Sequence, residues 1–186
     1  PAIANGFYYD VDFNGHSVTD KDFPTIEAKM LEIARGKYEF KMRPVSKAEA
    51  LSYYQGKNEY KTELIEALED GTITFCDHST FTDLCRGGHL PNTGFVKAVK
   101  ILSVAGAYWR GKENNPQMQR LYGVAFATQK ELDDYLERLE LAKQRDHRKL
   151  GRELDLYTMS TLVGVGLPLF TPRGTILRDV VAQYSN

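Results

Sequence analysis

The sequence predicts an α+β fold, with an antiparallel or mixed sheet and helices packed on it, followed by a long linker helix. Three observations predict this arrangement. Stretches rich in aromatic and β-branched residues alternate with segments whose apolar residues recur at helical spacing. Turn signals such as Asn14-Gly15 separate these segments, and no internal repeat interrupts them. After Thr128 the pattern changes to one extended, highly charged helix.

Capping residues, turn residues and apolar spacing place the individual elements. Up to residue 71 they are a hairpin over 6–18, a helix capped by Thr19 that stops near Gly36, a strand ending at Pro44, a helix over 47–54 capped by Ser46, and a helix over about 59–69. β-rich runs follow at 72–78, 96–109 and 121–128, and helical patterns at 129–157 and 177–184.

These elements divide the chain into three predicted regions. Residues 1–127 contain the sheet, residues 128–150 form the linker helix, and residues 151–186 are the front of a second domain. The chain starts at Pro1 directly in a strand pattern, so we expect it to be part of a longer protein.

Composition limits the class of protein. The 186 residues are 42% hydrophobic and 26% charged, which is enough to bury a core. No apolar run could cross a bilayer and no signal-peptide pattern is present, so a soluble, cytoplasmic protein without a membrane partner is expected. Because the formal net charge is −1, contact with nucleic acid requires a local basic face. Cys76 and Cys85 are predicted to be free thiols.

The segment DLCRGGHL, residues 83–90, places Cys85 four residues before His89 with two glycines between them. Adjacent glycines disfavour a helix and favour a tight turn that brings sulfur and imidazole to one pocket. Four chemistries use such a pair: redox exchange, metal ligation, nucleophilic attack and general base catalysis. Redox exchange lacks a Cys-x-x-Cys partner, and zinc lacks a third nearby ligand. Nucleophilic attack needs an orienting group that the sequence does not locate, and the spacing alone favours a purely structural role, with a buried thiol and a surface or hydrogen-bonded histidine.

Several blocks together resemble the bacterial type of threonyl-tRNA synthetase. In the family's order they are NGFYYDVD, DLCRGGHLPNTG, AGAYWRG, QRDHRKLGRELDLY and GLPLFTPRGTILRDVV. The resemblance covers nearly the whole chain. It implies that residues 1–127 are most of an editing domain, 128–150 the helix that follows it, and 151–186 the truncated start of a class II aminoacylation domain. The ATP site and catalytic zinc of that domain lie further along the family's sequence, so no cofactor is expected within this chain.

The resemblance implies hydrolysis of serine wrongly attached to threonine tRNA, at the 3′ acceptor end. Cys85 and His89 match the family's Cys-x-x-x-His element. His89 is expected to activate or position water, because a neutral imidazole accepts a proton near pH 7. Cys85 is expected beside the water rather than as the nucleophile. Asp83 matches a family position expected to orient the water or the substrate amine, although its place in the sequence fits an ordinary turn cap as well. Lys61 matches a family position expected to reach the ester carbonyl or the ribose, although the pattern by itself indicates a surface helix lysine.

Further site residues rest on the same resemblance. Tyr9 and Arg86 are implied to contact substrate, and His78 occupies a family position near the site without a defined role. Whether Cys85 and His89 hold a metal is left open. The family also carries a His-x-x-x-His motif on a helix ahead of NGFYYD, so this chain is expected to have an incomplete pocket, fewer metal ligands and an uncovered apolar face.

Two other hypotheses are open. The chain could be a module that binds the tRNA acceptor end without chemistry, through Lys97, Lys100, Arg110, Lys112 and the basic cluster of residues 143–152. It could also be a free-standing relative of the alanine-type editing proteins, which share the Cys-x-x-x-His element; the long helix and the tail argue against this. The parent protein is expected to be a homodimer.

Overall fold

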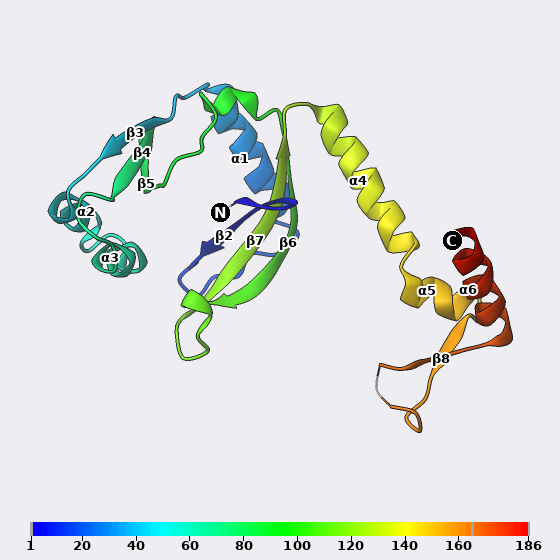
Figure 1. Cartoon of the computed structure of the whole chain (residues 1–186). Coiled ribbons are helices and arrows are strands. Elements are labelled where there is room, and N and C mark those ends of the chain that lie inside the picture. Colours follow the sequence, from blue (N-terminus) through cyan, green and yellow to red (C-terminus); the bar gives the residue numbers. More distant parts are fainter. Residues whose placement is uncertain (1, 165, 186) are drawn as a thin grey trace. The chain divides into compact units, whose positions relative to one another are not determined.

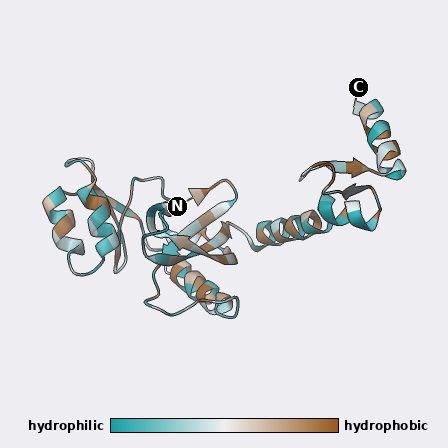
Figure 2. Cartoon of the chain, turned by 90° about the horizontal axis from the view of Figure 1, so that it is seen from below, coloured by the Kyte–Doolittle hydropathy of each residue, from teal (hydrophilic) through white to brown (hydrophobic). Residues whose placement is uncertain are grey.

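The computed structural model describes residues 2–164 and 166–185. The chain divides into two compact units, residues 1–132 and residues 133–186, and each is considered by itself. Both contain helices and antiparallel strands, which confirms the predicted α+β class (Figure 1). In Figure 2 most helices carry both hydrophobic and hydrophilic residues, as helices packed on one side do. Among the described residues, no helix combines the length and apolar character needed to cross a membrane.

The larger sheet of the first unit has four antiparallel strands in the order β1-β2-β7-β6. They are β1 (Ala2–Ile3), β2 (Gly6–Val11), β7 (Gln117–Phe126) and β6 (Ala98–Tyr108). Helix α1 (Phe23–Arg35) packs on this sheet, where Phe23 joins Ile101 and Leu121 in a buried cluster. The backbone amide of Ile101, beside a bulge in β6, donates to the Glu27 carboxylate at 2.8 Å. Apolar and polar contacts therefore both hold α1 on the sheet.

The smaller sheet of the first unit has the order β3-β4-β5. Its strands are β3 (Lys41–Pro44), β4 (Thr74–His78) and β5 (Phe81–Leu84), and the accompanying helices are α2 (Lys47–Tyr54) and α3 (Glu59–Glu66). Ile65, Ile73 and Phe75 are almost completely buried between helices and sheet. Ser46 caps α2 as predicted, accepting from the Glu49 amide at 3.1 Å. This packing fixes the position of β5, which carries the DLC segment.

Two connecting segments between the sheets run side by side. Glu39, between α1 and β3, forms an antiparallel bridge with Asn92, between β5 and the short helix η1 (Thr93–Phe95). The Thr93 amide donates to the Tyr38 carbonyl at 2.9 Å, and the Tyr38 amide donates to the Thr93 hydroxyl at 3.0 Å. These bonds set the register of the segments that precede β3 and follow β5.

The hairpin predicted over residues 6–18 is only half present. Asn14 and Gly15 have positive φ angles of 51° and 85°, as the predicted turn requires. The chain does not continue into a second strand, because β2 pairs with β7 and the Gln119 side chain bonds both the amide and the carbonyl of Val18. The predicted start of the first helix was also early: α1 begins at Phe23, and Thr19 donates to the Asp22 carboxylate instead of capping the helix.

The predicted continuous helix over 128–150 is interrupted. The structure has α4 (Gln129–Gln144), which crosses the boundary of the two units, and α5 (His147–Glu153). Asp146 lies between them and caps α5, accepting from the Arg148 amide at 2.8 Å. A cap residue has non-helical backbone angles, so the aspartate ends one helix and starts the next.

The second unit continues with elements that the sequence pattern showed only in part. A two-stranded sheet of β8 (Tyr157–Met159) and β9 (Pro168–Phe170) precedes α6 (Pro172–Ser185), which starts earlier than the predicted 177–184. Gly174 allows α6 to pass close to the backbone of Leu156, since a Cβ at position 174 would lie 1.8 Å from the Leu156 carbonyl oxygen. Positions 165 and 186 of the predicted region 151–186, like Pro1, lie outside the described residues.

A pH-dependent contribution to stability is expected from Asp77 on β4. The Thr82 hydroxyl and the Arg43 guanidinium, which donates at 2.8 Å, lower the pKa of Asp77. Because the folded pKa is lowered, the stabilisation is present above the unfolded value of about 3.9 and is lost as pH falls through the folded pKa. We therefore expect Asp77→Asn to lower the free energy of unfolding at pH 7 by about 0.5–1 kcal/mol, the scale of a partly exposed pair.

Urea unfolding followed by the fluorescence of Trp109, the single tryptophan, measures this effect. The difference between wild type and Asp77→Asn should shrink between pH 7 and pH 3, and the exposed Asp20→Asn serves as the control. A difference that is the same at both pH values would show that the carboxylate charge is not responsible.

Candidate active site

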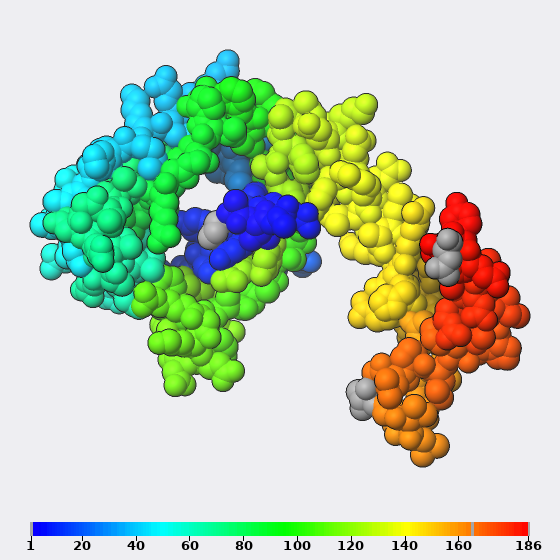
Figure 3. Space-filling model, viewed as in Figure 1, coloured from blue at the N-terminus to red at the C-terminus, as the bar shows by residue number. Residues whose placement is uncertain are grey.

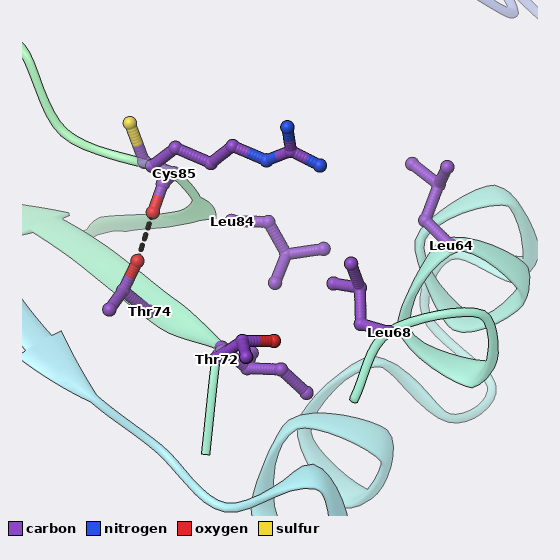
Figure 4. A pocket seen from close by; sticks show the side chains of 8 residues that line it. Leu64, Leu68, Thr72, Thr74, Leu84 and Cys85 are labelled. Carbon is purple, nitrogen blue, oxygen red and sulfur yellow. Dashed lines mark hydrogen bonds between the residues drawn. The ribbon is translucent and has the colours of Figure 1, made fainter. Parts of the chain in front are cut away.

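The candidate site starts at the end of β5. Asp83 pairs with Cys76 of β4, and the Cys85 amide extends the ladder by donating to the Thr74 carbonyl at 3.1 Å. Residues two apart on a strand point to the same face, so the side chains of Asp83 and Cys85 leave the sheet on one side. The Thr74 hydroxyl also donates to the Cys85 carbonyl (Figure 4).

The two glycines after Cys85 form the tight turn. Gly87 and Gly88 have φ angles of +102° and +83°, which side chains rarely allow, while a Cβ at either position would meet no atom within 4 Å. Glycine is needed here for backbone conformation and not for space. The turn brings His89 back so that its Nε2 lies 2.8 Å from the Cys85 Sγ. Cys85 is partly buried and His89 is exposed.

The His89 imidazole also contacts an aromatic ring, and this ring belongs to a small aromatic cluster. The Phe40 ring stacks on His89 with centroids 4.8 Å apart and planes 12° apart. His78 meets the same Phe40 ring edge-on at 5.2 Å and also lies against Phe81. His78 Nδ1 is buried and has no hydrogen-bond partner in the described part of the chain. His78 and His89 therefore both contact the Phe40 ring, which connects the two imidazoles by ring packing.

Asp83 is the centre of a second group. Its Oδ1 accepts from the Lys61 ammonium, from the Leu84 amide at 2.7 Å and from the Tyr54 hydroxyl at 3.4 Å, and its Oδ2 accepts from the Tyr9 hydroxyl at 3.4 Å. The Asp83 and Lys61 side chains are each 22% exposed. Burial and the neighbouring carboxylate raise the pKa of both tyrosines, so both hydroxyls keep their protons at neutral pH.

The structure thus brings together the predicted catalytic residues in two adjacent contacts, Lys61 with Asp83 and Cys85 with His89. Tyr9, from β2 of the larger sheet, reaches the first contact and helps to line a cleft of about 610 Å³ with Lys61, Tyr60 and Trp109. Figure 3 shows the surface hollowed between the N-terminal strands and the segment that follows β5.

Arg86 lies elsewhere. It is exposed and borders a largely apolar pocket with Leu64, Leu68 and Leu84, whereas the Cys85 sulfur points away from these leucines (Figure 4). Among the described residues, no hydrogen bond or ion pair joins Arg86 to the Asp83 group or to His89.

The Cys85–His89 pair by itself offers two donor atoms to a metal, the Cys85 sulfur and an imidazole nitrogen. A zinc site takes three or four ligands. Within residues 2–164 and 166–185, no group of three or more histidine, cysteine or acidic side chains is placed to hold an ion. Cys76 is free and buried, and burial raises the pKa of its thiol, which keeps it protonated.

Two contributors were missed in the sequence. Tyr54 lies at the end of α2 and Phe40 just before β3, and each reaches its partner across long sequence distances. No local signal distinguishes them from core aromatics. The basic residues proposed for binding are partly engaged: Lys100 pairs with Glu27 and Arg110 with Glu63.

Comparison with known proteins matches the segment that carries these contacts. Residues 73–122, which contain β4, β5 and the turn, match the family model described as the threonyl and alanyl tRNA synthetase second additional domain. The chain is 66% identical over 184 residues to the threonine–tRNA ligase of Flavobacterium johnsoniae, covering 99% of this chain and 28% of that protein. Identity to the ligase of Cytophaga hutchinsonii is 54% over 185 residues, covering 99% and 29%.

The chain is homologous to a segment of bacterial threonine–tRNA ligases. It spans less than a third of the length of these relatives. Cys85, His89, Asp83 and the strands that carry them all fall inside the matched second additional domain, while Tyr9 and Lys61 precede the matched residues.

Proposed function

We propose that this chain supplies most of the editing module of a threonine–tRNA ligase, the module that hydrolyses serine esterified to threonine tRNA. One observation carries the proposal: inside the matched domain, a glycine turn sets the His89 imidazole against the Cys85 thiol, two residues along the chain from Asp83, which pairs with Lys61. The end of β5 therefore carries an imidazole that can accept a proton, a neighbouring thiol and an ion pair.

The reaction is the attack of water on the ester carbonyl. His89 accepts one water proton as the oxygen bonds to the carbonyl carbon, and the proton passes to the ribose oxygen when the ester bond breaks. Because Nε2 faces the thiol, water is expected to meet Nδ1 of the imidazole. Lys61, tied to Asp83, supplies positive charge toward the developing oxyanion or the ribose. The Tyr9 hydroxyl lies at the same carboxylate and is placed to contact the substrate.

Serine is the expected error because it lacks one methyl group of threonine. An aminoacylation site discriminates against a substrate that lacks one methyl group by only about 1–3 kcal/mol. A second, hydrolytic site is therefore required for accuracy.

The proposed organisation follows the same relatives. In this proposal residues 1–127 are the editing domain without its N-terminal His-x-x-x-His helix, residues 128–150 are the linker region, and residues 151–186 are the truncated start of the aminoacylation domain. The parent ligase is proposed to be a cytoplasmic homodimer that uses ATP and zinc in that later domain and binds tRNA by its acceptor end. The proposal assigns no role to a metal in the editing site. Arg86 is retained as a candidate substrate contact on the family's pattern alone.

Binding without chemistry is the second candidate. Exposed Lys97 and Lys112 favour it, but Lys100 and Arg110 are already paired with carboxylates. In the basic cluster of 143–152, Arg148 pairs with Asp146 at 2.8 Å, which leaves less charge for phosphate.

A chimaeric ligase separates the two candidates. Residues 1–186 replace the corresponding segment of the Flavobacterium johnsoniae ligase, which is then incubated with serine, ATP and threonine tRNA. We expect little serine-charged tRNA to accumulate, and accumulation to rise when the segment carries Cys85→Ala and His89→Ala together. Equal accumulation from both chimaeras, with threonine charging intact, would support binding alone.

A further inference from the structure

We propose that Phe40 is a positioning residue that fixes the His89 imidazole in the orientation in which it faces the Cys85 thiol. The inference rests on the proposed function for its consequence in catalysis, but its structural content can be tested without it. Phe40 is half-buried and lies between α1 and β3, far in sequence from the turn that carries His89.

The turn by itself holds the imidazole loosely. His89 is exposed and follows two glycines. The glycines have no side chains to pack, and no atom lies within 4 Å of where a Cβ would be at either position. Glycine has more conformational freedom than any other residue, so two in succession make the orientation of the next side chain depend on contacts outside the turn. The imidazole contacts the Cys85 sulfur at the start of the turn and, outside the turn, the Phe40 ring.

Phe40 supplies the contact that sets the ring plane. The two rings lie 12° from parallel with centroids 4.8 Å apart, a stacked geometry that fixes the tilt of the imidazole. The sulfur contact through Nε2 fixes one atom, whereas the stack fixes the plane that contains both nitrogens. Together they determine where Nδ1 lies.

The position of Phe40 is itself determined by two contacts. The bridge between Glu39 and Asn92 holds its backbone neighbour against the segment after His89. The His78 ring packs edge-on against Phe40 at 5.2 Å and an interplanar angle of 88°. A phenylalanine held by backbone pairing and an adjacent ring can act as a fixed platform for a mobile side chain.

Nuclear magnetic resonance of this 21.1 kDa chain tests the platform directly. The chain has four histidines, and His89→Ala assigns the His89 ring protons. Stacking on Phe40 is expected to shift these protons upfield. In Phe40→Leu they should move to the position of an exposed histidine while the signals of His16 and His147 stay unchanged. Unchanged His89 signals in Phe40→Leu would overturn the proposal.

Two further variants guard against a folding defect. Phe40→Tyr keeps the ring and should keep the His89 shift, and Phe40→Met repeats the loss of the ring if the leucine variant unfolds. Phe95→Leu, which removes an exposed phenylalanine outside the stack, is the matched control and should leave His89 unchanged.

The same variants in the chimaeric ligase measure the catalytic consequence. Phe40→Leu should lower the single-turnover hydrolysis rate roughly twofold to tenfold, the scale of one aromatic stack, with tRNA affinity unchanged. Phe40→Tyr should restore the rate. A full rate in Phe40→Leu, in a chimaera whose hydrolysis depends on His89, would overturn the positioning role. If no chimaera hydrolyses the ester, the proposed function fails, and the resonance shifts still decide whether Phe40 orients His89.

Discussion

Replacing His89 by alanine is expected to slow the hydrolysis of serine-charged threonine tRNA by the chimaeric ligase about 10²- to 10⁴-fold, the usual contribution of one general base. The imidazole Nε2 is 2.8 Å from the Cys85 Sγ, and the side chain is exposed to the solvent from which the water comes. Removing the ring removes the proton acceptor but leaves the glycine turn and the β5 ladder in place. The fold should therefore be retained.

The matched control is His16→Ala. His16 is also exposed but lies in the turn after β2, outside the contacts that define the site. Rates come from single-turnover mixing of excess enzyme with preformed serine-charged tRNA. A rate in His89→Ala within threefold of wild type, at intact binding, would remove His89 from the chemistry.

Replacing Lys61 by methionine is expected to have the second largest effect. Lys61 and Asp83 are each 22% exposed, so their ion pair is shielded more than a surface pair and less than a fully buried one. We expect a loss of about 1–3 kcal/mol in the free energy of unfolding, between the values for those two classes. Hydrolysis should also slow, because the variant lacks the Lys61 ammonium, which is proposed to supply positive charge toward the developing oxyanion or the ribose.

A double-mutant cycle makes this test specific. The double variant Lys61→Met with Asp83→Asn should lose less stability than the sum of the single variants, since no uncompensated charge is left. Lys29→Met breaks a surface pair whose side chains are 64% and 66% exposed and should cost at most about 0.5 kcal/mol. Additive losses at Lys61 and Asp83, measured by urea unfolding through Trp109 fluorescence, would contradict a coupled pair.

The parts of the fold that local signals determine were predictable from the sequence. Ser46 caps α2 as expected, and the glycine pair of DLCRGGHL predicted the turn that joins Cys85 to His89. Both depend on residues within a few positions of each other. The resemblance to the synthetase family placed Lys61 and Asp83 in one site, which residue spacing alone did not.

The parts that failed depend on distant pairing. The predicted hairpin after Asn14-Gly15 gave way to pairing of β2 with β7, more than a hundred residues later, where Asp10 and Arg120 form a two-bonded ion pair. Phe40 and Tyr54 look like ordinary core aromatics in the sequence, because their partners His89 and Asp83 are brought to them only by the packing of β3, β4 and β5.

The most direct test of the central claim compares two esters on one tRNA. The chimaeric ligase is mixed in excess with threonine tRNA charged with serine or with threonine, and release of each amino acid is followed in a single turnover. We predict rapid release of serine that requires His89, and much slower release of threonine. Release of serine at the uncatalysed rate, or at an equal rate with and without His89, would contradict an editing site at the end of β5.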